Sequence, residues 1–140
     1  MRKIGIIAVL SLLVTAFAAV PVLAQNPQEV ANNPLTATLQ ETGDILVTGS
    51  IAGLGQGNVD ILVEGDFACE VRPGVNQPGG HLQAGEEDVT PRGGRVNIEE
   101  TLPAGTCPPG LNPVSPEVVT VTIFEAGTDI ILFQQEVAVT

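Results

Sequence analysis

The chain contains no tryptophan and no tyrosine, and its 140 residues include only four phenylalanines and one histidine. A core without large aromatic rings has to be built from Val, Ile and Leu, and β-branched residues favour strands. The same lack weakens carbohydrate binding as a function, because exposed Trp and Tyr rings are the usual amphipathic contact surfaces for such ligands. The composition therefore favours a small β-protein with an aliphatic core.

Basic residues are also scarce, since Lys3 is the only lysine of the chain. Beyond residue 24 only Arg72, Arg92 and Arg95 are basic, and they are set against all 16 acidic residues. Nucleic acids and anionic membrane surfaces attract clustered Lys and Arg, so neither is an expected partner. An excess of negative charge otherwise serves solubility.

One long apolar run occurs, from Ile4 to Val20, after the basic pair Arg2 and Lys3. Pro21 ends it, and Val22 to Ala24 supplies the small or aliphatic residues of a cleavage site. This layout predicts a signal peptide, residues 1–24, that is cut before Gln25 and directs the protein to a secreted or periplasmic location. The alternative is an uncleaved membrane anchor, although a span typically needs about 20 residues.

Cysteine occurs only at Cys69 and Cys107. In an oxidising compartment two thiols most often pair, so we expect a single disulfide that closes a loop of about 38 residues. Two cysteines cannot complete a structural zinc site alone, and His81 as a third ligand is the weaker alternative.

Alternating apolar and polar residues dominate the rest of the chain. Residues 25–34 are polar and are expected to be a flexible linker, and residues 35–140 are expected to form one domain. Residues 35–40 and 44–51 predict a hairpin around Thr42 and Gly43. Residues 59–71 give the longest alternation, as one bent strand or as two strands in register through a bulge. Cys69 has the apolar parity there, so the disulfide should be buried.

Proline and glycine interrupt the chain from Arg72 to Pro116. In this region we expect only residues 95–102 to form a strand and the rest to be loop. A second hairpin, with strands at 119–123 and 131–139, closes the domain. About seven strands with such frequent turns predict an all-β fold, an immunoglobulin-like antiparallel β-sandwich, with an open barrel as the alternative.

Part of this pattern resembles a group of short secreted bacterial proteins with one disulfide and no assigned activity. The residues that carry the resemblance are Leu46 to Gly55, Gly57, Val59 to Ile61, Gly65, Cys69, Asn76, Pro78 and Gly79. The resemblance covers roughly residues 35 to 80. It implies a single-disulfide β-sandwich and carries no functional residues over to this chain.

Two features suggest ion or phosphate binding and have simpler explanations. The glycine-rich stretch Gly53 to Gly57 joins two strands, whereas phosphate-binding loops lead into a helix, so we interpret it as a turn. Glu86, Glu87 and Asp88 are candidate Ca²⁺ ligands. They lack the alternating spacing of Ca²⁺ loops, and a solvated loop is the favoured interpretation.

Two further features suggest catalysis. Asp60, Glu64, Asp66 and Glu70 share one strand face, and carboxylates two residues apart lie about 7 Å from each other. That spacing suits a glycosidase-like pair, but alternation alone places acids on a wet face. His81 follows a Pro-Gly-Gly sequence and is expected to lie exposed in a loop.

No catalytic constellation emerges from these residues, and no Gly-x-Ser-x-Gly sequence occurs. We therefore expect a non-catalytic secreted module, structural or protein-interacting, with an unknown protein partner and no cofactor. The alternative is a Ca²⁺- or carbohydrate-binding extracellular module.

Overall fold

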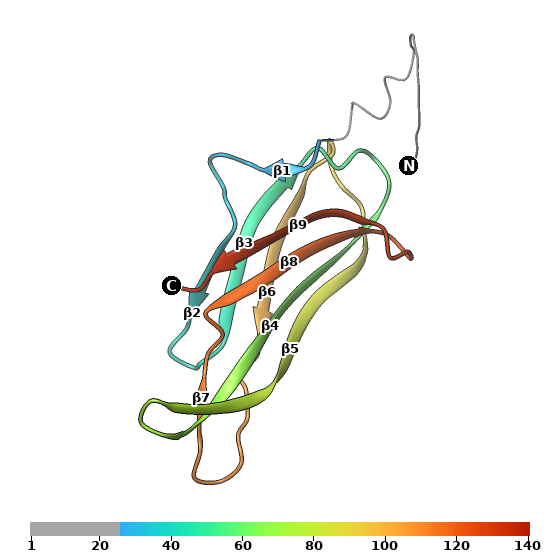
Figure 1. The fold of residues 1–140 in the computed structure, drawn as a ribbon. Helices are drawn as coiled ribbons and strands as arrows, with labels where there is room; N and C mark the ends of the chain where they lie inside the picture. Colours follow the sequence, from blue (N-terminus) through green and yellow to red (C-terminus); the bar gives the residue numbers. More distant parts are fainter. Residues whose placement is uncertain (1–25) are drawn as a thin grey trace, which may run out of the picture.

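The structure, a computed structural model, describes residues 26–140, and the predicted signal peptide lies outside them. This part of the chain forms nine strands and no helix (Figure 1). The strands are β1 (Gln28–Glu29), β2 (Thr36–Leu39), β3 (Ile45–Ala52), β4 (Val59–Arg72), β5 (Val75–Val89), β6 (Val96–Leu102), β7 (Asn112–Val114), β8 (Val118–Glu125) and β9 (Ile131–Ala138).

The first sheet is built around β3. Strand β6 pairs antiparallel with one side of β3, and β1 and β2 pair with the other side, one after the other. The β2–β3 hairpin predicted from the alternation of residues 35–51 is confirmed, and Gly43 in its turn has a φ of 92°. That left-handed conformation costs glycine little.

The second sheet is built around β4. Strand β5 pairs along the full length of one side of β4, whereas β8 pairs only with its first half and the short β7 with its far end. Strand β9 completes the sheet beside β8, which confirms the predicted closing hairpin.

The two sheets pack face to face around an aliphatic core, so the predicted immunoglobulin-like β-sandwich is confirmed. The fully buried members include Ile45, Val47, Val63, Leu102 and Val121. In the constant-type immunoglobulin order the fourth strand joins the first sheet. Here the fourth long strand, β5, pairs with β4 in the second sheet. The first sheet therefore contains three long strands and the second contains four. A parallel bridge between Ala37 and Val139 joins the two sheets at one edge.

The expectation that residues 72–116 form a loop apart from a strand at 95–102 is wrong, because β5, the longest strand of the fold, spans Val75–Val89 and β7 spans Asn112–Val114. The turn that precedes β5 is Pro73-Gly74, where Gly74 has a φ of 80°. Proline followed by glycine in that conformation fits a tight turn, which sends the chain straight back along β4. Residues 59–71, for which two arrangements were open, form one continuous strand that ends at Arg72.

The segment 26–34 was expected to be a flexible linker, yet it is attached to the first sheet through β1. Backbone hydrogen bonds join Val30 N to Ser50 O and Ser50 N to Asn33 O. The Glu29 carboxylate also accepts a hydrogen bond from Leu35 N at 2.8 Å. Obligatory backbone donors next to an unpaired strand edge explain why this polar segment pairs with β3.

Candidate functional site

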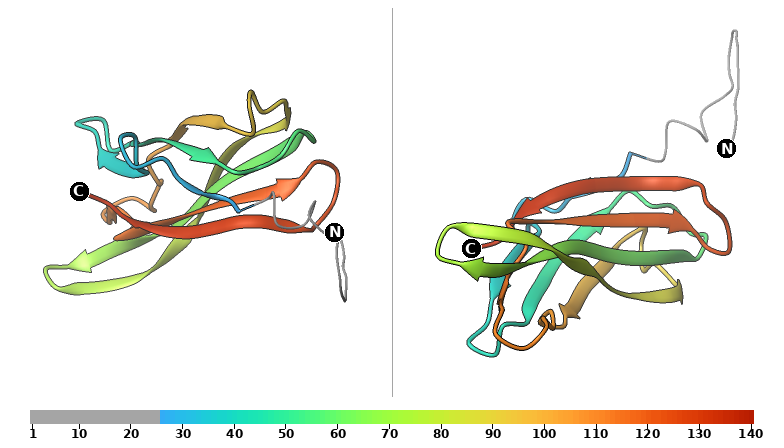
Figure 2. Two further views of the ribbon diagram at one scale, coloured as in Figure 1. Left: turned by 90° about the horizontal axis from the view of Figure 1, so that it is seen from above. Right: turned by 60° about the horizontal axis from the view of Figure 1, so that its bottom comes forward.

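The end of the β4–β5 hairpin extends past the two sheets (Figures 1 and 2). The last residue pair that joins β4 to β8 is Glu64–Thr120, and beyond it β4 pairs only with β5 and the three-residue β7. We call residues 65–82 the arm. All residues from Val75 to His81 are exposed, so most of the arm lies outside the core.

The disulfide is located in the arm. Cys69 and Cys107 are joined as predicted, with their Cα atoms 5.9 Å apart, and Cys69 is only 2% exposed. The bridge connects β4 to the segment between β6 and β7. A covalent link at this point holds the arm against the neighbouring segment.

A second contact fixes the arm through Phe67. A side-chain carbon on Gly79 would lie 2.6 Å from the Phe67 ring, and one on Gly105 would also collide with it. The ring is therefore enclosed by two segments that approach it closely because they carry glycine. The pairing of β4 with β5 shifts here, from Phe67–Gly80 to Ala68–Pro78, so Gly79 is the extra residue of a β-bulge.

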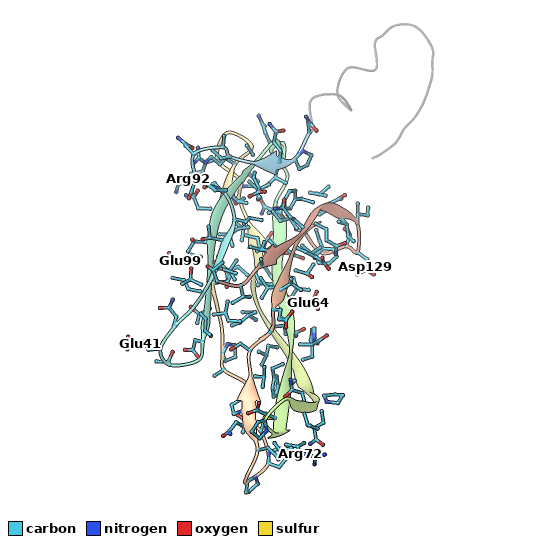
Figure 3. All side chains as sticks on the ribbon, turned by 60° about the vertical axis from the view of Figure 1, so that its left-hand side comes forward. Glu41, Glu64, Arg72, Arg92, Glu99 and Asp129 are labelled. Carbon is cyan, nitrogen blue, oxygen red and sulfur yellow. A yellow bond between two sulfur atoms is a disulfide. The ribbon has the colours of Figure 1, made fainter. Side chains whose placement is uncertain are left out.

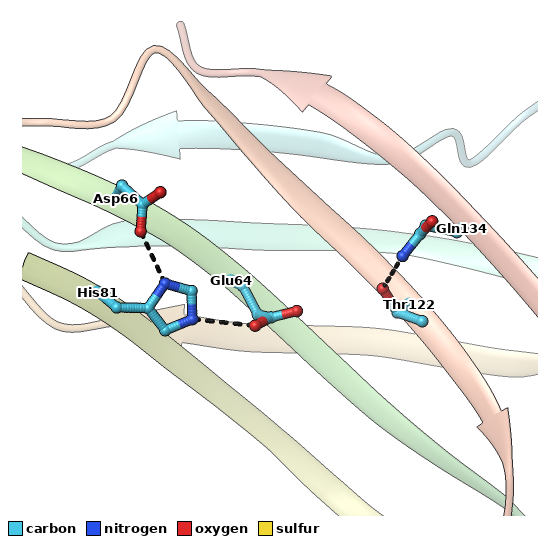
Figure 4. Close-up of polar contacts among 5 residues, drawn as sticks. All are labelled: Glu64, Asp66, His81, Thr122 and Gln134. Atoms are coloured by element: carbon cyan, nitrogen blue, oxygen red, sulfur yellow. Dashed lines mark hydrogen bonds and ion pairs between the residues drawn. The ribbon is translucent and has the colours of Figure 1, made fainter. Parts of the chain in front are cut away.

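At the base of the arm the only histidine lies between two carboxylates (Figure 4). His81 Nδ1 is 2.7 Å from Asp66 Oδ1, and His81 Nε2 is 2.9 Å from Glu64 Oε1. These hydrogen bonds, first that to Asp66 and then that to Glu64, raise the pKa of His81. The side chains of His81 and Asp66 are 50% and 82% exposed, so the cluster is open to solvent.

The strand register explains this cluster. His81 of β5 stands directly opposite Asp66 of β4, and Glu64 is two residues away on the same face. The three side chains line a shallow depression of about 440 Å³ with two further acids, Glu117 and Glu136. The expectation of a loop histidine is therefore wrong, although its expected exposure is correct.

The four acids predicted to share a face of β4 have different roles. Asp60 accepts hydrogen bonds from the backbone N–H groups of Asp88 and Gly127, which lower its pKa and link β4 to the end of β5 and to the turn between β8 and β9. Glu64 and Asp66 both contact His81. Glu70 belongs to the arm. The two acids of this face that lie two residues apart, Glu64 and Asp66, therefore share His81 as a hydrogen-bond partner.

The acidic run Glu86 to Asp88 lies in β5, not in a loop, and its side chains do not converge. Asp88, which has a φ of 59°, accepts a hydrogen bond from Asn58 Nδ2 at 2.8 Å. Glu86 contacts a residue of another strand, Glu100. Among residues 26–140 no group of three or more His, Cys, Asp or Glu side chains is placed to hold a metal ion.

Glu100 of β6 is a residue that the sequence analysis missed. It is 8% exposed, and its Oε2 atom is buried with no hydrogen-bond partner among residues 26–140. Burial, and then the neighbouring Glu86, raise the pKa of Glu100 to about 7. The sequence does contain a signal for the burial of this residue, because Val96, Ile98, Glu100 and Leu102 share the inward parity of β6. A carboxyl at an inward position of an alternating strand is unusual.

The stretch Gly53 to Gly57 connects β3 to β4, as the turn interpretation predicted. From residue 26 onward the structure has no helix long and apolar enough to cross a membrane. No protein-family model, no curated protein and no solved structure matches this chain.

Proposed function

We propose that the chain is a secreted or periplasmic, non-catalytic module that binds another protein through its arm. The observation that carries this proposal is the position of the disulfide, which holds an exposed hairpin and not the core of the sandwich. A buried disulfide is typical of oxidising compartments, which supports the location.

A rigid arm is suited to binding because a preformed surface loses less conformational entropy on association. Three features restrict this hairpin: the disulfide, the enclosed Phe67 ring, and the pairing of Ala68 to Glu70 with β7. None of them adds a residue to the central aliphatic cluster. An element that is restrained although it lies outside the core is expected to serve a function, here the binding of a partner.

The tip of the arm has the chemistry of a contact surface. Val71 and Val75 flank the Pro73-Gly74 turn and are 41% and 39% exposed. Arg72, one of three arginines in the described residues, lies beside them, at the end of the molecule opposite Arg92 (Figure 3). Aliphatic side chains with an arginine form a common kind of binding patch, whereas the rest of the surface is rich in acids.

Two observations support a non-catalytic role. Both cysteines are consumed by the disulfide, so neither offers a thiolate nucleophile. Both ring nitrogens of His81 contact carboxylates, which leaves neither nitrogen free to take a proton from a serine or water.

The proposal is tested by co-purification from the envelope of the producing cell. The double variant Val71→Ser, Val75→Ser should lose the co-purifying protein by about tenfold or more, as expected for central apolar contacts. The matched control is Ile131→Ser, because Ile131 is 50% exposed and lies on β9, away from the arm. Equal retention by the two variants and by the wild type contradicts the proposal.

A further inference from the structure

The acidic residues of this chain are unevenly distributed. None lies between Glu70 and Glu86, and none lies between Glu100 and Glu117, although the chain contains 16. The first interval holds the tip of the arm and most of β5, and the second holds β7 and the segment that precedes it. Two long acid-free intervals in so acidic a chain indicate a surface with a different use from the rest.

The fold joins the two acid-free intervals to each other. Strand β7 pairs with β4 inside the arm, and the disulfide connects Cys69 to Cys107 with their Cα atoms 5.9 Å apart. Both intervals are therefore attached at the same part of the arm. Figure 1 shows the turn of the β4–β5 hairpin and the segment before β7 at the same end of the molecule.

The segment before β7 contains a tight turn, residues 108–111, which we call the proline turn. Leu111 N donates a hydrogen bond to Pro108 O at 3.1 Å, and Gly110 has a φ of 88°. These features fit a type II turn with Pro109 and Gly110 at its centre, and the arm tip carries the same Pro-Gly pair. Both prolines of the turn are exposed, so it presents a preformed surface to solvent.

The two turns are close enough for one partner to contact both. Pro109 is two residues from Cys107, and Arg72 is three residues from Cys69. Because the disulfide holds the two cysteines 5.9 Å apart at Cα, the reach of the chain limits the separation of the Pro109 and Arg72 Cα atoms to about 24 Å. A standard protein interface buries about 800 Å² on each partner, which is broad enough to cover both turns.

Arg72 determines which charge the partner should carry. It is the only Lys or Arg in the two acid-free intervals, and it takes part in no ion pair within residues 26–140. A guanidinium group presents its donors as a planar fork that matches a carboxylate. An acidic partner would be repelled by the rest of this acidic surface, so the same charge would also orient it towards the arm.

We propose that the arm tip, residues 71–75, and the proline turn together bind one partner protein, whose surface is apolar and presents a carboxylate to Arg72. This inference rests on the proposed function, because it names a second contact and the partner chemistry for binding through the arm. The occupant is a different protein and not a second copy, since two chains with a formal net charge of −11 repel each other.

Co-purification from the envelope of the producing cell tests the inference with two substitutions. Pro109→Ser should reduce the captured partner by about fivefold or more, and Arg72→Glu by about tenfold or more because it brings like charges together. Two matched controls should retain wild-type capture. They are Pro34→Ser, at an exposed position between β1 and β2, and Arg92→Glu, at an exposed position at the opposite end of the molecule (Figure 3).

The outcomes separate this inference from binding through the arm itself. If Val71→Ser, Val75→Ser loses the partner while Pro109→Ser retains it, the arm binds alone and the inference is overturned. Undiminished capture by Arg72→Glu overturns it as well, and this variant decides the matter if Pro109→Ser does not fold. A captured complex of two copies of this chain, identified by its mass, has the same consequence. Full capture by the Val71, Val75 double variant instead contradicts binding through the arm.

Discussion

Glu100 occupies an inward position of β6, whose other inward residues are Val96, Ile98 and Leu102, and this makes it the residue with the most distinctive chemistry in the fold. Its folded-state pKa lies above the ordinary value of 4.5. A carboxyl that binds its proton more tightly when folded stabilises the protein below pH 4.5. That stability is lost as the pH rises through 4.5 towards 7.

This linkage predicts that the effect of Glu100→Gln on the unfolding free energy depends on pH in the absence of divalent cations. The variant keeps the shape and hydrogen-bonding groups of a protonated carboxyl, so it should match the wild type near pH 4. At pH 8 it should be more stable by about 1–3 kcal/mol, because no buried charge remains. Urea unfolding at the two pH values measures the difference.

His81 acts in the same direction, since its raised pKa gives stability that is lost as the pH rises through that folded pKa. The wild type and Glu100→Gln both retain His81, so the contribution of His81 to stability cancels when the two proteins are compared. A difference between the two proteins that does not change with pH contradicts the role assigned to Glu100.

Gly105 gives a second residue-scale prediction, because a side-chain carbon there would collide with the Phe67 ring. Gly105→Ala should cost about 1–3 kcal/mol of unfolding free energy, the usual cost of overpacking. Gly57→Ala is the matched control, since a carbon at Gly57 meets nothing within 4 Å, and it should change stability by less than about 0.5 kcal/mol. Equal effects in denaturant unfolding contradict the enclosure of Phe67.

At the scale of elements, the disulfide should matter most for the arm. Replacing both Cys69 and Cys107 by Ser should lower the unfolding free energy by about 2–5 kcal/mol, as for other small secreted domains. Hydrogen exchange of amides in residues 75–82 should accelerate more than that of β8, which is central to its sheet. Uniform acceleration across both elements contradicts a specific role for the bridge in the arm.

The sequence predicts well the strands that have one buried face, because their apolar and polar residues alternate. Strands β3, β8 and the first half of β4 alternate because they line the core, and the cysteine pair follows from composition alone. Strand β5 escaped prediction because Pro78, Gly79, Gly80 and Gly85 break its pattern. Its pairing with β4, which supplies most of its interactions, overrides these weak local propensities.

The candidate site was less predictable than the fold, for a related reason. The contact of His81 with Asp66 and Glu64 depends on the β4–β5 register, which includes a bulge at Gly79. The meeting of Glu86 with Glu100 depends on how the two sheets approach each other. Both contacts depend on tertiary geometry, whereas sequence patterns indicate only which face of a single strand is exposed to solvent.

At the scale of the whole molecule, the end of the disulfide-linked β4–β5 hairpin extends past the two sheets of an acidic β-sandwich. The core lies between the two sheets, β6 carries the buried Glu100, and the arm carries the disulfide. If the arm binds a partner as proposed, this division separates stability from recognition. Changes at the arm tip should therefore alter binding while the melting temperature stays within a few degrees of the wild type.

Photo-crosslinking in the producing cell tests the central claim most directly. With Val75 replaced by p-benzoyl-phenylalanine, illumination should give one discrete adduct with a single protein, and the same residue placed at Ile131 should not. An adduct that forms equally from both positions, or none from Val75 in folded protein, contradicts binding through the arm.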